Sequence, residues 1–169
     1  MTSSPNVTRH NASVTRPRRE TLNGHQSVNL WFTGVSGSCK STIAHAVEER
    51  LHLQGKRIYV FDGDNVRHGL CGNLGFSMGD RRENLRRITE MTRPFLDSGV
   101  ISLTAFISPL TEDRNRIREI IGPDDFIEIY CNCPLNNEMS KDCIKKQGKE
   151  ILKVTLVFPH PMSHQSIQT

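Results

Sequence analysis

The segment GVSGSCKST, residues 34–42, constrains this chain more than any other part of it. It follows the apolar run Val28–Thr33, which predicts a buried strand, and it precedes a helical pattern from Ser41 to about Gln54. A glycine-bearing turn that joins a strand to a helix can bind a triphosphate, because its N–H groups and the positive end of the helix converge on phosphate oxygens. The alternative, a chance Gly/Ser turn, leaves the matching flanking elements unexplained. The order therefore predicts a nucleoside triphosphate site.

The predicted ATP ligands are the consecutive residues Gly34, Val35, Ser36, Gly37, Ser38, Cys39, Lys40, Ser41 and Thr42. Lys40 is expected to neutralise the β/γ-phosphates, and Ser41 is expected to hold Mg²⁺. Cys39 departs from the pattern, which has glycine before the lysine, and its side chain should cost about 1–3 kcal/mol in strain or lost phosphate contact. Two interpretations stay open: an acidic thiol beside Lys40 that makes nucleotide binding sensitive to oxidation, or a tolerated substitution.

Composition predicts one globular domain. The chain has 169 residues, of which 36% are hydrophobic, which is enough for one core and too few for two. No apolar stretch approaches the roughly 20 residues of a membrane span, and no signal peptide is apparent, so a cytoplasmic protein is expected. The five cysteines lack the spacing of a disulfide framework or a zinc site and are expected to be reduced. A net charge of +4 suits small acidic substrates as well as it suits nucleic acid.

Apolar runs alternate with helical patterns along the chain. Strands are expected at residues 28–33, 57–61, 100–106 and 126–131, and helices at 41–54, from 80 to a kink or an end near Pro94, and at 112–121. This alternation predicts an α/β fold with a doubly wound parallel sheet that binds ligands at the carboxyl ends of its strands. Residues 1–20 lack apolar periodicity and are predicted to form a mobile tail.

Three chain segments carry polar residues to the predicted ligand edge. Asp62 and Asp64 follow the second strand, Ser108 follows the third, and residues 65–80 form a glycine-rich loop that could wrap a ligand. An ordinary polar turn is the alternative for Asp62, and a solvated surface is the alternative for the arginines after the loop.

The segments LWFTGVSGSCKST, FDGDNVRHGL, LGF, DRRENLRR and LTAFISP together resemble adenylylsulfate kinases, which use ATP and Mg²⁺ to phosphorylate adenosine 5′-phosphosulfate (APS) on its 3′-hydroxyl. The product, PAPS, belongs to sulfate assimilation. FDGDNVRHGL and LTAFISP are more specific than the phosphate loop, and the resemblance covers roughly Val14 to Leu135. It implies a P-loop kinase fold.

The resemblance also implies roles for residues outside the phosphate loop. Phe76 offers a face for adenine, and Arg67 and Arg81 offer planar donors for sulfate and phosphate oxygens. Asp62 would be the general base or a Mg²⁺ ligand, and the catalytic set would be Lys40, Asp62 and Ser108. Ser108 is the family's phosphoserine position, but it is expected first as a substrate contact. The implied APS ligands are Asp64, Asn65, Val66, Arg67, Phe76, Arg81, Asn84, Ile107 and Ser108.

The resemblance ends near Leu135. Residues 21–135 are therefore predicted as the kinase-like domain, and residues 136–169 as a divergent tail. Reading Cys143–Lys146 one base earlier with permitted codons gives LYKK, a family sequence, which favours a shifted reading frame. The family's segment there forms a lid over the substrate, so impaired activity is expected.

A non-catalytic nucleotide-binding protein, a dimer partner or the product of a decaying gene is the alternative to an active kinase. The expected partner is APS. Nucleic acid is not expected, because the basic residues lack interleaved aromatic platforms, and a membrane is not expected, because the chain has no apolar span. A homodimer stays open.

Overall fold

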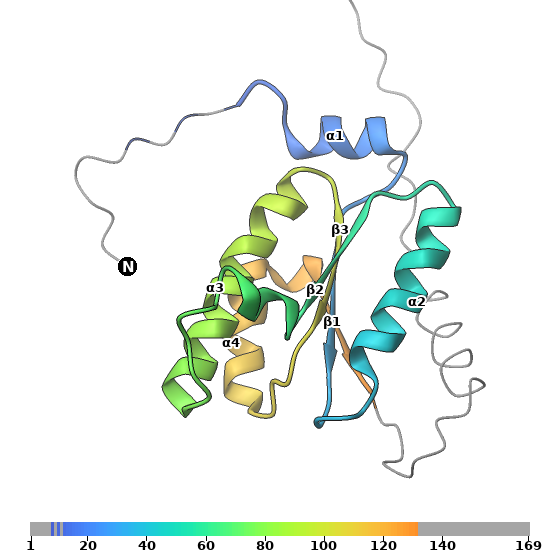
Figure 1. The fold of residues 1–169 in the computed structure, drawn as a ribbon. Helices are drawn as coiled ribbons and strands as arrows, with labels where there is room; N and C mark the ends of the chain where they lie inside the picture. The colour runs from blue at the N-terminus through green and yellow to red at the C-terminus, as the bar shows by residue number, and fades with distance from the viewer. Residues whose placement is uncertain (1–7, 9, 11, 132–169) are drawn as a thin grey trace, which may run out of the picture.

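A computed structural model describes residues 8, 10 and 12–131 of the chain. Its centre is a parallel sheet of four strands in the order β2-β3-β1-β4 (Figure 1). The strands are β1 (Asn29–Thr33), β2 (Ile58–Asp62), β3 (Ile101–Ala105) and β4 (Phe126–Tyr130). Leu30 of β1 lies between Leu103 of β3 and Ile127 of β4. The predicted parallel α/β fold is confirmed.

Helices cover both faces of this sheet (Figure 1). Helix α2 (Lys40–Leu53) lies on one face, and α3 (Met78–Asp97) and α4 (Thr111–Ile121) lie together on the other. Each helix follows a strand and packs back on the sheet, which places the strand-to-helix loops at one edge. Two short 3₁₀ helices, η1 (Asn65–His68) and η2 (Pro123–Asp125), complete the connections.

Two apolar cores result, one on each face of the sheet. The α2 core contains Ile43, Val47 and Leu51, which form one stripe of the helix and are essentially inaccessible. The core on the α3/α4 side is built around Trp31 and Ile88. Because β1 is buried on both faces along its whole length, the loop that follows it starts from a rigid support.

Two sequence-based expectations need correction. Residues 16–20, expected in a mobile tail, belong to helix α1 (Arg16–Asn23). Of the kink or end expected near Pro94, the end is wrong, because helix α3 continues to Asp97. Pro94 lies on the exposed side of α3, where water can replace the missing N–H donor.

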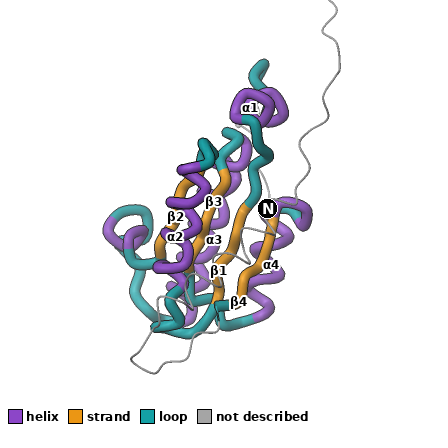
Figure 2. The backbone as a smooth tube through the Cα atoms, turned by 90° about the vertical axis from the view of Figure 1, so that its right-hand side faces the viewer, coloured by secondary structure: helices purple, strands orange, loops and turns teal. Residues whose placement is uncertain are grey.

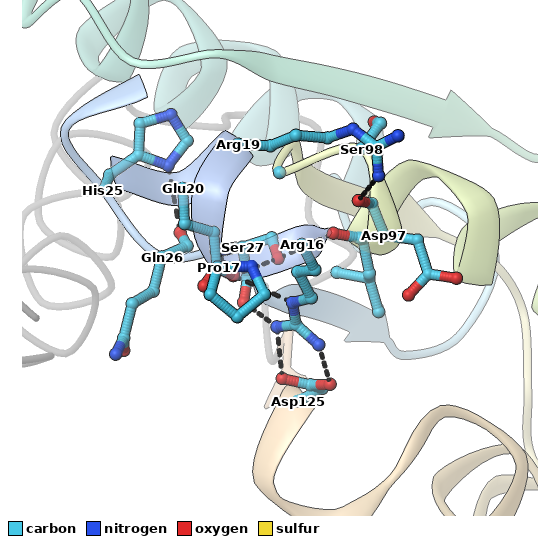
Figure 3. Close-up of polar contacts among 12 residues, drawn as sticks. Arg16, Pro17, Arg19, Glu20, His25, Gln26, Ser27, Asp97, Ser98 and Asp125 are labelled. Atoms are coloured by element: carbon cyan, nitrogen blue, oxygen red, sulfur yellow. Dashed lines mark hydrogen bonds and ion pairs between the residues drawn. The ribbon is translucent and has the colours of Figure 1, made fainter. Parts of the chain in front are cut away.

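Helix α1 is held at the end of the sheet opposite to the phosphate loop (Figure 2). Figure 3 shows its main anchor, the guanidinium of Arg16, whose Nη1 and Nη2 lie 2.5 and 2.7 Å from the carboxylate oxygens of Asp125. Arg16 also donates to the carbonyl of Ser27 over 2.8 Å and to Glu20 over 2.8 Å. Helix α1 buries no residue, so polar contacts to distant parts of the chain hold it in place.

Within the described part of the chain, no helix combines the length and apolarity needed to cross a bilayer. The predicted tail after Leu135 begins beyond Cys131 and lies outside the described residues, as do residues 1–7.

Candidate nucleotide and substrate site

The phosphate loop joins β1 to α2 through three residues with positive φ, Gly34 (152°), Gly37 (79°) and Cys39 (65°). Gly34 has no room for a side chain: a Cβ there would lie 2.5 Å from Oγ of Ser38 and 2.7 Å from the carbonyl oxygen of Cys131. The loop therefore needs glycine at its start for both conformation and close approach.

Cys39 is the only non-glycine residue with positive φ among those the structure describes. Its φ of 65° and ψ of 21° place it in the left-handed region as the N-cap of α2. An L side chain in this region costs about 1–2 kcal/mol. The predicted conflict between Cys39 and the loop conformation is therefore present in the backbone.

Lys40 starts α2 with its ammonium group turned into the loop. Its side chain is largely buried, and Nζ donates to the carbonyl of Val35 over 2.7 Å and to Oγ of Ser38 over 3.4 Å. Burial lowers the pKa of Lys40, while the nearby carboxylates of Asp62 and Asp64 oppose that shift. An anionic phosphate oxygen is a stronger acceptor than a carbonyl, so a triphosphate can take over these contacts.

Asp62 ends β2 and supplies a nearly buried carboxylate to the same edge. Its Oδ1 accepts the N–H of Asp64 over 3.0 Å and that of Asn65 over 3.4 Å, which fixes the direction of the carboxylate. The N–H of Gly63 donates to the carbonyl of Ala105 over 3.1 Å and ties this turn to the end of β3. The alternative of an ordinary polar turn does not explain why the carboxylate lines a cleft.

A cleft of about 770 Å³ opens along this edge between the phosphate loop and the start of α3. Its lining comes from the phosphate loop, the turn after β2, the loop before α3, the first turns of α3 and the end of β3. The predicted site residues in this lining are Ser36, Gly37, Cys39, Lys40, Ser41, Thr42, Asp62, Asp64, Arg67, Phe76, Arg81, Asn84 and Ile107.

The end of the cleft away from the phosphate loop is aromatic and basic. The ring of Phe76 is 71% exposed, with the guanidinium carbon of Arg67 4.4 Å and that of Arg81 5.9 Å from its centroid. Arg67 donates to the carbonyls of Leu74 and Gly75, and these bonds hold it over the ring. A planar ring system with anionic substituents matches this combination.

Asn84 adds a polar group on the α3 side of the cleft. Its side chain is 4% exposed, and its Nδ2 has no hydrogen-bond partner within residues 12–131. A buried amide without a partner is costly, and a ligand oxygen in the cleft can satisfy it.

Ser108 is not brought to the cleft. Its side chain is fully buried, and its Oγ lies 3.0 Å from Nε1 of Trp31 and 2.9 Å from Oγ1 of Thr33. The expected substrate contact by Ser108 therefore does not match its position, because packing of β3 against β1 turns this side chain into the core. The other predicted site residues outside the lining are Gly34, Val35, Ser38, Asn65 and Val66.

Four lining residues are absent from the predicted set: Gly63, Leu85, Ala105 and Phe106. All four lie inside the diagnostic segments, so the segments themselves carried the signal. Leu85 lies on the apolar stripe of α3, a pattern that indicates core and gives no sign of its second contact with the cleft.

Comparisons with known proteins agree on one family. The family model described as Adenylylsulphate kinase matches residues 26–154, beyond the point where the sequence analysis placed the end of the resemblance. A probable adenylyl-sulfate kinase of Bacillus subtilis is 53% identical over 136 residues, covering 80% of this chain and 68% of the relative. The adenylyl-sulfate kinase of Acaryochloris marina is 54% identical over 132 residues, covering 78% of this chain and 64% of the relative.

A solved structure shows the same fold. The APS kinase of Mycobacterium tuberculosis in complex with AMPPNP and APS superimposes with a TM-score of 0.62 at 37% identity, covering 83% of this chain and 85% of that one. This chain spans about two thirds of the length of the two curated relatives named above.

Proposed function

Since this chain belongs to the adenylylsulfate kinase family, we propose that it transfers the γ-phosphate of ATP to the 3′-hydroxyl of APS, giving PAPS for sulfate assimilation. One observation carries the proposal: a single cleft joins a phosphate loop at one end to Phe76, Arg67 and Arg81 at the other, with Asp62 in its lining. This layout suits two nucleotides that meet through their phosphate and hydroxyl groups.

The phosphate loop would bind ATP. Lys40 exchanges its contacts with Val35 and Ser38 for the β/γ-phosphates, and the N–H groups at the start of α2 bind phosphate oxygens. Oxygen donors from Ser41 and Asp62, which both line the cleft, are the hard ligands that Mg²⁺ prefers. Bound Mg²⁺ would neutralise charge on the transferring phosphoryl group.

The opposite end of the cleft would bind APS. Adenine stacks on Phe76, Arg67 and Arg81 bind the sulfate and phosphate oxygens, and Asn84 donates its unpaired N–H to the substrate. Asp62, which is fixed by two backbone N–H groups, either accepts the 3′-hydroxyl proton or positions Mg²⁺. Phosphoryl transfer depends mainly on such positioning and charge neutralisation, so direct in-line transfer needs no covalent intermediate.

Reduced or absent turnover is a second candidate outcome, and the left-handed backbone at Cys39 favours it. A chain of this kind would bind nucleotides without efficient transfer. Thermal shift measured with ATP and with APS, beside an assay for PAPS, separates the two. Stabilisation by both ligands with PAPS formation supports the kinase, stabilisation without PAPS supports the binding protein, and no response to either ligand contradicts both.

Localisation and assembly are part of the same proposal. A kinase that consumes ATP for sulfate assimilation is expected in the cytoplasm, and a homodimer is the simplest assembly for it. Light scattering of the purified chain measures the assembly directly: a mass equal to one 19.2 kDa chain at all concentrations contradicts the dimer.

A further inference from the structure

Trp31 is the only tryptophan in the chain, and it is fully buried in β1. Its indole ring packs against Phe106, with ring centroids 5.7 Å apart and planes inclined by 24°, and against Phe126 at 6.0 Å. Phe106 lines the cleft, so one packed ring separates Trp31 from the proposed substrate.

The polar atom of the same indole starts a directed chain of hydrogen bonds. An indole N–H can only donate, so Oγ of Ser108 must accept it across 3.0 Å. The hydroxyl groups of Ser108 and Thr33 are hydrogen-bonded to each other, with their oxygens 2.9 Å apart. The hydroxyl group of Thr33 also donates to the carbonyl of Ser108 across 3.3 Å, so Thr33 contacts both the side chain and the backbone of Ser108.

These hydrogen bonds fix Ser108, the buried residue that follows Ile107 of the cleft lining. The carbonyl of Ser108 also accepts from Nη1 of Arg114 over 2.8 Å, and Arg114 is itself paired with Glu128 of β4 over 2.7 Å. Ser108 therefore has its hydroxyl and its carbonyl both engaged by buried or paired groups, and small displacements of it break several bonds together.

Trp31 thus holds two neighbours of one exposed residue. Its ring supports Phe106 and its N–H holds Ser108, while Ile107 between them is 41% exposed and lines the cleft. Ala105, which precedes Phe106, accepts the N–H of Gly63 at its carbonyl oxygen. We propose that Trp31, acting through Ser108 and Phe106, is a positioning residue that sets the wall of the cleft against which APS binds.

The assignment of Trp31 rests on the proposed function for its ligand, APS, but it makes a separate prediction about the affinities for APS and ATP. Loss of the indole N–H should loosen the wall beside APS and affect the phosphate loop less, because Lys40 is held within that loop by the carbonyl of Val35 and Oγ of Ser38. Its signature is a split between the affinities for the two nucleotides. A general loss of stability would instead weaken both.

The test uses the full chain with Trp31→Phe, which keeps a ring but removes the N–H, and Ser108→Ala, which removes the acceptor without a large change in volume. Ser102→Ala is the matched control, because Ser102 is a buried hydroxyl on β3 whose Oγ has no hydrogen-bond partner among the described residues. Calorimetric titration gives the dissociation constants for APS and ATP, and the single indole ¹⁵N–¹H signal of the Ser108→Ala and Ser102→Ala variants reports the hydrogen bond.

Both test variants should weaken APS binding by about fivefold to tenfold and change ATP binding by less than about twofold, while Ser102→Ala changes neither. The indole signal should move and its proton should exchange faster in Ser108→Ala alone. Equal losses for ATP and APS, unchanged APS binding, or an indole signal that ignores Ser108→Ala would overturn the assignment. If the unaltered chain binds ATP but not APS, the proposed function fails as well. If the unaltered chain binds APS and the substitutions leave that binding unchanged, only the assignment of Trp31 fails.

Discussion

At the scale of single residues, Cys39 combines a side chain with a backbone conformation that suits glycine. Replacement by glycine removes the conflict, so Cys39→Gly should raise the free energy of unfolding by about 1–2 kcal/mol and tighten ATP binding. Chemical denaturation and calorimetric titration with ATP measure the two effects. Cys39→Ala is the control, because alanine removes the sulfur but keeps the Cβ. An alanine variant that gains as much as the glycine variant would show that the sulfur, and not the backbone, causes the penalty.

His25 ties the chain before β1 to the chain before β2. Its Nε2 accepts the N–H of Arg57 over 3.0 Å, so the ring is neutral with its proton on Nδ1, 3.0 Å from the carbonyl of Gln26. Burial, helped by the charges of Lys56 and Arg57, lowers the pKa of His25 from 6.5, although the Gln26 carbonyl and Glu20 act in the other direction. Protonation would remove the acceptor for Arg57.

A lowered pKa in the folded state sets the sign of the pH dependence. Below pH 6.5 the unfolded chain binds more protons at His25 than the folded chain does, so the free energy of unfolding falls as pH drops through this range toward the folded-state pKa. His25→Gln should show a shallower loss between about pH 7.5 and about pH 5.5. His45→Gln, at an exposed histidine on α2, is the control for the substitution itself. Identical slopes for all three proteins would contradict the role given to His25.

Residue-level prediction from sequence reaches furthest where a backbone motif determines position. Most of the predicted phosphate loop, Asp62, Phe76 and the arginines beside Phe76 line one cleft, and their roles stay predictions. Ser108 did not follow: Ile107 before it lines the cleft, whereas the side chain of Ser108 is buried against Trp31. A strand end alternates its side chains, and the sequence does not show which of them meets a partner such as Trp31.

At the scale of elements, helix α1 is stabilised by polar contacts with other parts of the chain, above all by the bonds between Arg16 and Asp125. Arg16→Gln should remove the paired bonds to Asp125 and lower the free energy of unfolding by about 1–3 kcal/mol, since bonds to charged groups are the stronger kind. Amide hydrogen exchange should also become faster across Arg16–Asn23. Arg18→Gln is the control on the same helix, because Arg18 is exposed and donates only to the carbonyl of Ser13 in the described contacts. Equal effects of the two substitutions would contradict the specific role of Arg16.

The same helix explains a limit of prediction from sequence. The strands and the helices α2 and α4 were expected within a residue or so of their observed ends, because apolar periodicity defines them. Helix α1 has no buried residue and no apolar stripe, and its partner Asp125 lies far along the chain. The bond to Asp125 spans 109 positions of the chain, so apolar periodicity does not indicate it, and the only local signals are Pro17 at the start of the helix and Gly24 at its end.

At the scale of the whole molecule, the described residues line a cleft whose aromatic end is exposed. Phe76 is 71% exposed, although the proposed function has it stacked on adenine. Adenylylsulfate kinases resemble this chain as far as Leu135 by motif and to residue 154 by family match. The shifted-frame hypothesis for residues 136–169 therefore stays a prediction from sequence.

That prediction has a decisive measurement. A chain in which residues 136–169 are replaced by the translation of the same DNA in the neighbouring frame should regain the lid that the resemblance to the family implies for this segment. PAPS formation should then rise by about tenfold or more, because excluding water strengthens every charge contact in the cleft. ATP affinity should change little, since Gly34–Thr42 is untouched, and Cys39→Gly in the same background should add its own gain independently. Equal turnover by the original and the replaced chain would show that the cleft works without that segment.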